Sequence, residues 1–311
     1  MTQIAYLTVS NLTKPVGGIM VQAAHVAALA REGYDAKLCT TFSGDRPDWI
    51  DPNAPLVNSN RAAVGPGDVL VLHDSVPRTM FDRFMSMPLR RVFFCQNHYF
   101  IDQTLSPEER LADFPIDAFI CASEPIAAYL RDFHGVADPV VIRPGIMQPQ
   151  VESVEKRLRV CFMPRKRLIE SGAVIHRLRN LHPELADVAF VSIHGQHPAK
   201  VAEVMAECAV FLSLSVNEGL GLPPLEAMQS GCLVVGYHGG GGLDYATEES
   251  GLWYDSATPD DLVALLADAL KRLKEQPKAF DRMLEAGKRT AEGYRLDAME
   301  RELLRFWENF L

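Results

Sequence analysis

Two glutamates in the C-terminal third of the chain flank a glycine-containing turn. Glu218 comes directly before Gly219-Leu220-Gly221-Leu222, and Glu226 follows two prolines. Glycine lacks a Cβ atom, so the backbone of this turn can approach a ligand closely. A helix that begins at the prolines would point free N–H groups and the positive end of its dipole at the turn, where phosphate binds well. The segment therefore predicts an anion site, and Glu226 in the first helical turn could accept hydrogen bonds from a ribose. The alternative is an ordinary helix N-terminus with an acidic first turn.

This string resembles the E-x7-E element of the retaining glycosyltransferases of family 4, which have the GT-B fold. Glu218 and Glu226 match its two acidic ends, and Gly231 with the Val-Val step at 234–235 matches its usual continuation. The resemblance implies that Glu226 binds the ribose hydroxyls and that Glu218 faces the donor sugar. It also implies that the backbone between them lies against sugar hydroxyls or phosphate, at Gly219, Leu220, Gly221 and Leu222.

A basic cluster, Arg165-Lys166-Arg167, follows the predicted strand 160–163. The family places an arginine here, and a lysine about five residues later, to grip the departing diphosphate, whose developing charge preorganised cations stabilise better than water does. Arg165 matches the arginine, but Glu170 stands at the lysine spacing, so Lys166 or Arg167 would have to supply the second cation. The alternative is a solvated basic start of a helix, although cations there oppose the helix dipole.

Two histidines follow apolar runs in the N-terminal half of the chain, at His73 and His98. The carboxyl ends of strands line the cleft in open α/β sheets, so both side chains could face a substrate. The family carries a functional histidine after the strand that corresponds to 91–96, and the resemblance implies that His98 contacts the transferred sugar. His73 could orient the acceptor. A purely structural histidine is the alternative at both positions.

Two glycine clusters also follow predicted strands. Gly17 and Gly18 resemble the N-terminal glycine loop of the family, which can bring backbone N–H groups to the donor diphosphate or the acceptor. A simple strand-to-helix turn is an equal alternative. The run 239–242, which includes Gly240 and Gly241, resembles a glycine-rich stretch that borders the donor site. Four glycines cost more backbone entropy than a turn requires, so we expect close approach to sugar or phosphate there, with a flexible lid as the alternative.

The composition is that of an ordinary soluble globular protein, and 311 residues suggest two domains. The net charge of −9 argues against nucleic acid as a partner, because neutralising phosphates needs a basic face. No run approaches the roughly 20 apolar residues of a membrane-spanning helix, and the N-terminus carries no basic signal-peptide region. The six scattered cysteines, without a C-x-x-C pair, indicate buried thiols in a reducing cytoplasm rather than disulfides or a zinc site.

Apolar runs alternate with helical segments along the chain, which indicates an α/β architecture with parallel sheets. The alternation breaks over 147–157, which is polar and contains proline and is therefore the predicted linker. The resemblance implies a GT-B fold of two Rossmann-like α/β/α domains that face a cleft. We expect an N-terminal acceptor domain over 1–150, a C-terminal nucleotide-sugar donor domain over 151–294, and a final helix over 295–311 that packs back on the N-terminal domain.

A stretch of mixed apolar and basic residues over 81–91 raises the question of peripheral membrane contact. It ends in Arg90 and Arg91, and basic amphipathic segments can dock on anionic lipid. An internal helix followed by a strand explains the pattern more simply.

The sequence therefore predicts a retaining, metal-independent glycosyltransferase. It would move a sugar from a nucleotide-diphosphate sugar to a glycan, a lipid-linked acceptor or a small molecule. No D-x-D motif follows a predicted strand, which agrees with diphosphate binding without a metal ion, and we expect no cofactor. One alternative is a non-catalytic nucleotide-sugar-binding subunit, to which the missing lysine at Glu170 gives weight. A sugar-nucleotide epimerase and a phosphorylase on the same fold are further alternatives.

Overall fold

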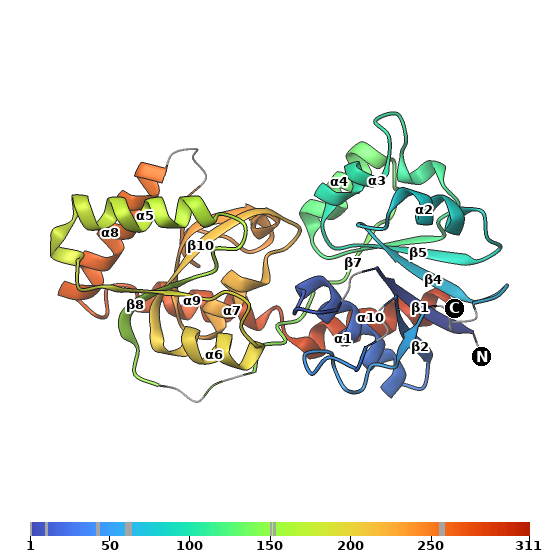
Figure 1. Ribbon diagram of the computed structural model, residues 1–311, viewed down its shortest axis with the longest axis horizontal. Coiled ribbons are helices and arrows are strands. Elements are labelled where there is room, and N and C mark those ends of the chain that lie inside the picture. Colours follow the sequence, from blue (N-terminus) through green and yellow to red (C-terminus); the bar gives the residue numbers. More distant parts are fainter. Residues whose placement is uncertain are drawn as a thin grey trace. The chain divides into compact units, whose positions relative to one another are not determined.

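The chain divides into two compact units, each built on its own parallel sheet (Figure 1). The computed structural model describes residues 2–9, 12–41, 44–59, 64–149, 151, 154–254 and 259–311. The N-terminal unit comprises Met1–Gly145 and Leu296–Leu311, and the C-terminal unit comprises Ile146–Arg295. The domain boundary expected at Gln150 lies outside the described residues. The predicted α/β fold class with parallel sheets is confirmed.

The sheet of the N-terminal unit has the strand order β3-β2-β1-β4-β5-β6-β7. The strands are β1 (Gln3–Thr8), β2 (Asp35–Thr40), β3 (Leu56–Asn58), β4 (Val69–His73), β5 (Arg90–Cys95), β6 (Ala118–Cys121) and β7 (Val140–Val141). The helices are α1 (Gly17–Arg31), α2 (Arg78–Met85), α3 (Ile101–Thr104), α4 (Glu124–His134) and α10 (Leu296–Phe310), with 3-10 turns η1 (His98–Phe100) and η2 (Leu111–Asp113). The central strands are nearly continuous apolar runs because parallel sheets are covered on both faces.

The last helix of the chain, α10, belongs to the N-terminal unit and lies beside α1 (Figure 1). Its buried face consists of Met299, Leu303, Phe306 and Trp307. The Trp307 ring lies 6.4 Å from the ring of Tyr6 in β1, and Arg31 of α1 donates a hydrogen bond of 2.6 Å to Glu300. Burying one such aromatic side chain contributes about 3 kcal/mol, so this helix is an integral part of the unit.

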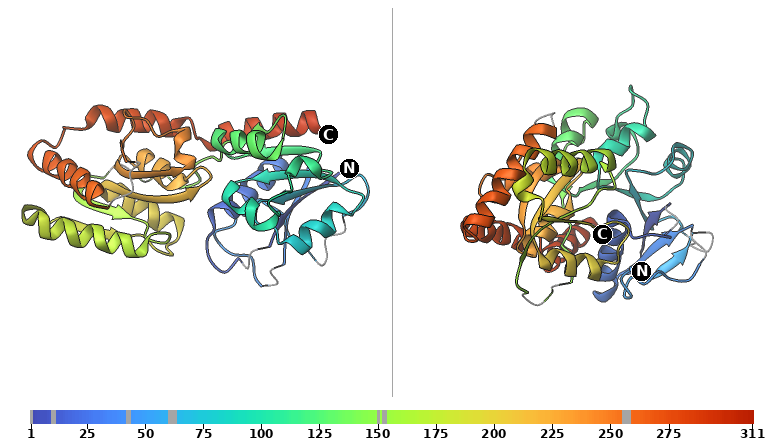
Figure 2. Two further views of the ribbon diagram at one scale, coloured as in Figure 1. Left: turned by 90° about the horizontal axis from the view of Figure 1, so that it is seen from above. Right: turned by 60° about the vertical axis from the view of Figure 1, so that its left-hand side comes forward.

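The sheet of the C-terminal unit has the order β12-β11-β10-β8-β9. Its strands are β8 (Arg157–Phe162), β9 (Ala189–Ser192), β10 (Cys208–Glu218), β11 (Leu233–Gly240) and β12 (Leu252–Trp253). Its helices are α5 (Leu168–Leu181), α6 (Pro198–Glu207), α7 (Leu222–Gln229), α8 (Pro259–Glu275) and α9 (Asp281–Glu292), with 3-10 turns η3 (Pro183–Leu185) and η4 (Gly241–Asp244). Alternate strand residues enter two cores, one beneath α5 and α8 and one beneath α6 and α7. Figure 2 shows helices on both sides of this sheet.

The carboxyl ends of β8, β10 and β11 lie at one edge of the C-terminal sheet, because neighbouring strands run parallel. The ends of these strands, with the connections that follow them, carry the basic cluster, the turn between the two glutamates and the glycine run. The topology therefore gathers all three at the edge where open α/β sheets bind ligands.

Arg90 and Arg91 bind backbone carbonyl groups within the N-terminal unit. The guanidinium of Arg91, a residue that is 5% exposed, donates hydrogen bonds to the carbonyl oxygens of Phe84, Met85, Met87, Leu89 and Pro115. Arg90 donates one to the carbonyl oxygen of Phe310 at 2.6 Å. The helix and strand expected over 81–91 are α2 and β5; Arg91 bonds α2 and the segment that joins it to β5, and Arg90 bonds the last residue of α10. In the part of the chain that the structure describes, no helix is long and apolar enough to cross a membrane.

Replacing Arg91 by alanine removes its hydrogen bonds to five carbonyl oxygens, including the one to the buried Leu89, so we expect the free energy of unfolding to fall by about 3 kcal/mol. Arg83→Ala, on the exposed face of α2, is the matched control and should change it by less than about 0.5 kcal/mol. Urea denaturation followed by circular dichroism measures both variants. Equal stability of the two would contradict the structural role of Arg91.

Candidate active site

The two predicted glutamates lie on either side of the connection from β10 to α7. β10 ends at Glu218, after a register shift against β11. Asn217 has a φ of 48°, in the left-handed region, and Gly221, with a φ of 85°, caps α7. The helix starts at Leu222, ahead of both prolines. Glu226 is consequently the fifth residue of α7, so the expected position in the first turn is wrong and the helix dipole does not explain this carboxylate.

Lys166 reaches this turn from the connection between β8 and α5. Its Nζ atom lies 2.8 Å from Oε1 of Glu218 and donates hydrogen bonds to the carbonyl oxygens of Val216 and Asn217 at 3.0 and 3.2 Å. A partly exposed ion pair alone contributes little stability. Three contacts from one ammonium group, however, fix the path of the backbone just before the turn.

Arg165 lines a hollow of about 60 Å³ together with Lys166, Glu218 and Pro223. Its side chain is exposed and makes no ion pair or hydrogen bond with any described residue. Such an arginine can bind an anion through several N–H groups without first giving up another partner. The structure thus brings together Glu218, Arg165 and Lys166, three of the four residues predicted to be catalytic.

Arg167, the other candidate for the second cation, is bound by side chains of the C-terminal unit. It forms an ion pair with Glu170, and its guanidinium lies over the Tyr237 ring at 4.7 Å. The Tyr237 hydroxyl donates a hydrogen bond of 2.7 Å to Glu170. The residue at the spacing of the family lysine therefore anchors a neighbouring arginine and a tyrosine.

Glu226 is half-buried in α7, and its carboxylate has no hydrogen-bond donor among the described residues. Burial raises the pKa of this carboxyl group to about 7, because the charged form loses contact with water. A carboxylate in this state gains from any ligand that supplies hydroxyl donors.

The glycine run spans the end of β11 and the start of η4, and it packs against the segment that leads into the Glu218 turn. A Cβ atom on Gly241 would lie 2.3 Å from the carbonyl carbon and oxygen of Gly219, and one on Gly239 would lie 2.7 Å from the Cβ atom of Ser215. Gly240 has a φ of 89°, which favours glycine. We expected these glycines to bring backbone close to sugar or phosphate. The observed close approach is instead to the Glu218 turn, and the binding roles of Gly240 and Gly241 stay predictions.

Two tyrosines support this region, and sequence reasoning missed both. The Tyr245 hydroxyl donates a hydrogen bond of 2.6 Å to the carbonyl oxygen of Gly221, and the Tyr294 hydroxyl donates one of 2.9 Å to Asp244. The partners are 24 and 50 residues apart, so no local pattern joins them.

Gly17 and Gly18 are the first two residues of α1, not a loop ahead of it. Their N–H groups are among those that an α-helix leaves without intrahelical partners, which suits an anion. The Gln96 side chain donates a hydrogen bond of 3.0 Å to the carbonyl oxygen of Gly18. A Cβ atom on Gly18 would lie 3.4 Å from that side chain.

His73 is the last residue of β4, and its side chain is hydrogen-bonded to the segment that follows this strand. Its Nδ1 atom accepts a hydrogen bond from the backbone N–H of Ser75 at 3.2 Å, and burial lowers its pKa to about 4. The adjacent Asp74 accepts hydrogen bonds of 2.5 Å from the N–H groups of Gln96 and Asn97. Burial outweighs these donors and raises the pKa of Asp74 to about 7. Asp74 therefore positions Gln96, and through it the start of α1.

His98 lies in η1, in the N-terminal unit. Its ring packs 4.1 Å from Tyr99 and 4.6 Å from Tyr129. Burial lowers its pKa, with Asp102 opposing the shift, which favours the neutral ring. This packing gives His98 a structural role beside the predicted contact with the transferred sugar.

The six cysteines are buried and unpaired, as expected from their spacing. Over the described ranges, no group of three or more histidine, cysteine or acidic side chains is placed to hold a metal ion.

Replacing Gly241 by alanine should disrupt the Glu218 turn, because the new methyl group would overlap the Gly219 carbonyl group. We expect a loss of about 3 kcal/mol in the free energy of unfolding of the C-terminal unit. Gly172→Ala in α5 is the control, since nothing lies within 4 Å of its Cβ position, and it should add about 0.5–1 kcal/mol. Thermal denaturation separates the two, and an unaffected Gly241→Ala would refute the close backbone contact.

Sequence comparisons relate the chain to enzymes that transfer sugars. Residues 179–289 match the family described as glycosyl transferases group 1. The alpha-1,6-glucosyltransferase of Actinobacillus pleuropneumoniae serotype 7 (strain AP76) is 26% identical over 231 residues, which cover 72% of this chain and 69% of that protein.

Solved structures share the fold over 99% of this chain. HepE from Anabaena, in complex with UDP-glucose, is similar over its whole length with a TM-score of 0.74 and 14% identity. The pneumococcal O-GlcNAc transferase GtfA, in complex with UDP and GlcNAc, is similar over 99% of its length with a TM-score of 0.71 and 11% identity. Sucrose-phosphate synthase from Thermosynechococcus elongatus is similar over 99% of its length, also at 0.71, with 14% identity. The chain is a glycosyltransferase with the GT-B fold that carries a group 1 domain.

Proposed function

We propose that this glycosyltransferase is a metal-independent, retaining enzyme of family 4, with Glu218 and Glu226 as its E-x7-E pair. Its donor would be a nucleotide-diphosphate sugar and its acceptor a glycan, a lipid-linked molecule or a small molecule. One observation carries the proposal: Arg165 lies in the same hollow as Glu218, α7 carries Glu226, and neither charged group has a partner among the described residues. The names of HepE with UDP-glucose and GtfA with UDP support a nucleotide-sugar donor.

In this proposal each group has a distinct role. Glu226 accepts hydrogen bonds from the ribose hydroxyls, and Glu218 faces the donor sugar. The backbone from Gly219 to Leu222 lies against the sugar or the phosphates. Arg165, with Lys166 beside it, neutralises the diphosphate as it leaves, which removes the need for a metal ion. His98 contacts the transferred sugar, while His73 orients the acceptor.

Retention follows if the acceptor attacks from the face that the diphosphate leaves. The bond between the anomeric carbon and the phosphate oxygen breaks, the acceptor oxygen bonds to that carbon, and the acceptor proton passes to a phosphate oxygen. Such a step needs charge stabilisation at the phosphate and no protein nucleophile. The unpaired thiols support the proposed cytoplasmic location, since an oxidising compartment favours disulfides.

Nucleotide binding tests the donor site directly. We expect one of UDP, GDP, ADP, CMP and dTDP to raise the melting temperature of the wild-type protein, because a ligand that binds only the folded state stabilises it. Glu226→Ala should abolish that shift. The selected nucleotide then defines which sugar donors to assay for transfer. If no nucleotide stabilises the protein, or the variant responds like wild type, the proposed donor site is wrong.

The nucleotide affinity should also depend on pH. Only ionised Glu226 accepts two hydroxyl donors, and its pKa in the free protein is about 7, so affinity should be about tenfold weaker at pH 6 than at pH 8. Glu226→Gln removes this contribution and leaves only the titration of the nucleotide phosphate. Without nucleotide, the effect of pH on the stability of the free protein has the opposite sign. The raised pKa of Glu226 means that the folded protein loses stability as pH rises through 7, so Glu226→Gln should melt at a higher temperature than wild type at pH 8.

The anomeric configuration of the product tests the proposed stereochemistry. We expect proton NMR of the first-formed product to show the configuration of the donor sugar. An inverted anomer would refute retention while leaving the donor site in place.

A further inference from the structure

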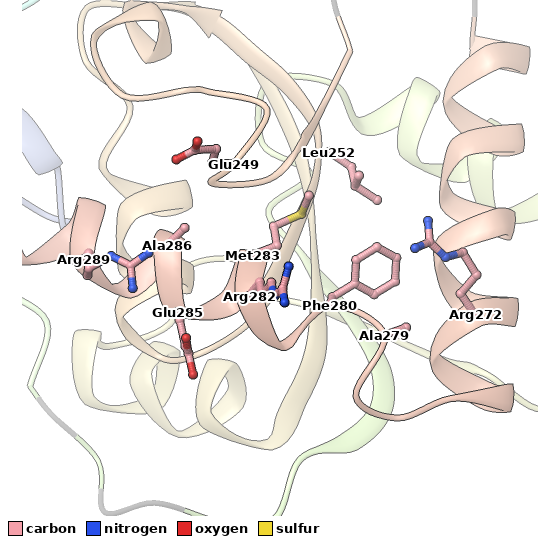
Figure 3. Close-up of a pocket in the computed structure, with 10 residues that line it drawn as sticks. All are labelled: Glu249, Leu252, Arg272, Ala279, Phe280, Arg282, Met283, Glu285, Ala286 and Arg289. Atoms are coloured by element: carbon pink, nitrogen blue, oxygen red, sulfur yellow. The ribbon is translucent and has the colours of Figure 1, made fainter.

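The C-terminal unit has a second, larger hollow of about 530 Å³ (Figure 3). Its walls come from the segment before β12, the end of α8, the connection to α9, and α9 itself. This volume is within the range of small-molecule sites. The hollow shares no residue with the one beside Glu218. β12 is the edge strand of the sheet, so this hollow lies at the margin of the unit rather than at the end of β10.

Three arginines enter the hollow, and the structure holds them in different ways. The guanidinium of Arg272, at the end of α8, lies over the Phe280 ring at 4.4 Å. Arg282 and Arg289 are exposed on α9 and make no ion pair or hydrogen bond with any described residue. In Figure 3, Arg282 lies between Arg289 on one side and Arg272 on the other. Two turns of helix separate Arg282 from Arg289, about 10 Å along the axis.

Arginine is the side chain best suited to phosphate, because its planar N–H groups bind two oxygens at once. A chain with a net charge of −9 gathers three of them here. Two of them have no ion-pair partner over the described ranges, which favours an anionic ligand in the hollow over internal ion pairs.

Two glutamates limit which anion fits. Glu249 and Glu285 line the same hollow, so its charged lining is three arginines against two glutamates, a net of +1. Carboxylates repel a bare polyanion, but they accept hydrogen bonds from hydroxyl groups. The half-buried side chains of Leu252 and Met283 supply an apolar wall against which the C–H face of a sugar ring can pack.

We propose that this hollow binds a phosphorylated sugar, with phosphate at the arginines of α9 and ring hydroxyls at Glu249 and Glu285. The site is separate from the donor site, and the inference does not rest on the proposed function. It gives the enzyme a place at which a metabolite other than the donor can bind.

Isothermal titration calorimetry with glucose 6-phosphate at constant ionic strength tests the proposal. We expect saturable one-to-one binding to the wild-type protein. Arg282→Gln with Arg289→Gln should weaken it at least about tenfold, as expected when a charged phosphate partner is lost. Both residues are exposed, so the melting temperature of this variant should match that of wild type.

Two control variants make the result specific. Arg179→Gln with Lys288→Gln removes the same charge from the same unit, at an exposed site on α5 and at a lysine that packs beside Gly231, and should bind like wild type. Arg165→Gln should also leave this binding intact, since Arg165 lies in the other hollow. Absence of saturable binding, equal loss in the first control, or loss in Arg165→Gln would each overturn the proposed site.

Substitution of the two glutamates tests whether the pocket binds a sugar ring. Glu249→Gln with Glu285→Gln should reduce the preference for glucose 6-phosphate over inorganic phosphate, because it replaces charged hydroxyl acceptors by weaker neutral ones and removes the repulsion of a bare anion. A preference that stays unchanged would refute the assignment of a sugar ring to this pocket.

Discussion

The form of the candidate active site depends on one backbone contact, between Gly241 and the peptide that follows Gly219. It requires a residue without a Cβ atom, and it places η4 directly against the turn between the two glutamates. Tyr245 and Lys166 then fix the two sides of that turn through its carbonyl oxygens. Most polar groups at this edge are therefore occupied by the protein itself. Arg165 and Glu226 are exceptions: neither has a partner in the part of the chain that the structure describes, which makes them the groups best suited to bind a ligand.

Much of the fold was predictable because buried parallel strands are apolar runs. The apolar composition of β1, β6 and β8 predicts these strands, and the helical spacing of apolar residues predicts the helices between them. The sequence did not reveal β3 and β12, since strands of two or three residues have no periodicity. Hydrophobicity also does not encode the end of β10, because the strand continues to Glu218 through an irregular register.

Part of the candidate site could likewise be predicted from the sequence, and part could not. The sequence predicts that Glu218 and Glu226 flank one turn and that Arg165 follows a strand, because each of these positions depends on neighbours in the sequence. The contact from Lys166 to the turn spans about fifty residues, and that from Tyr237 to Glu170 spans 67. Such pairs are set by sheet order, which a single sequence does not specify. The packing of the glycine run against the Glu218 turn could not be predicted for a related reason, because its close neighbour is another segment of the chain.

The cluster of Glu170, Arg167 and Tyr237 makes position 170 interdependent with its neighbours. A lysine introduced there to match the family pattern would face Arg167 instead of neutralising it, and the Tyr237 hydroxyl would lose its acceptor. Like charges at this separation repel, so the exchange would be unfavourable unless Arg167 changed as well. A lysine at position 170 therefore needs a compensating change at Arg167, so the two arrangements of charge at this edge cannot be exchanged by one favourable substitution.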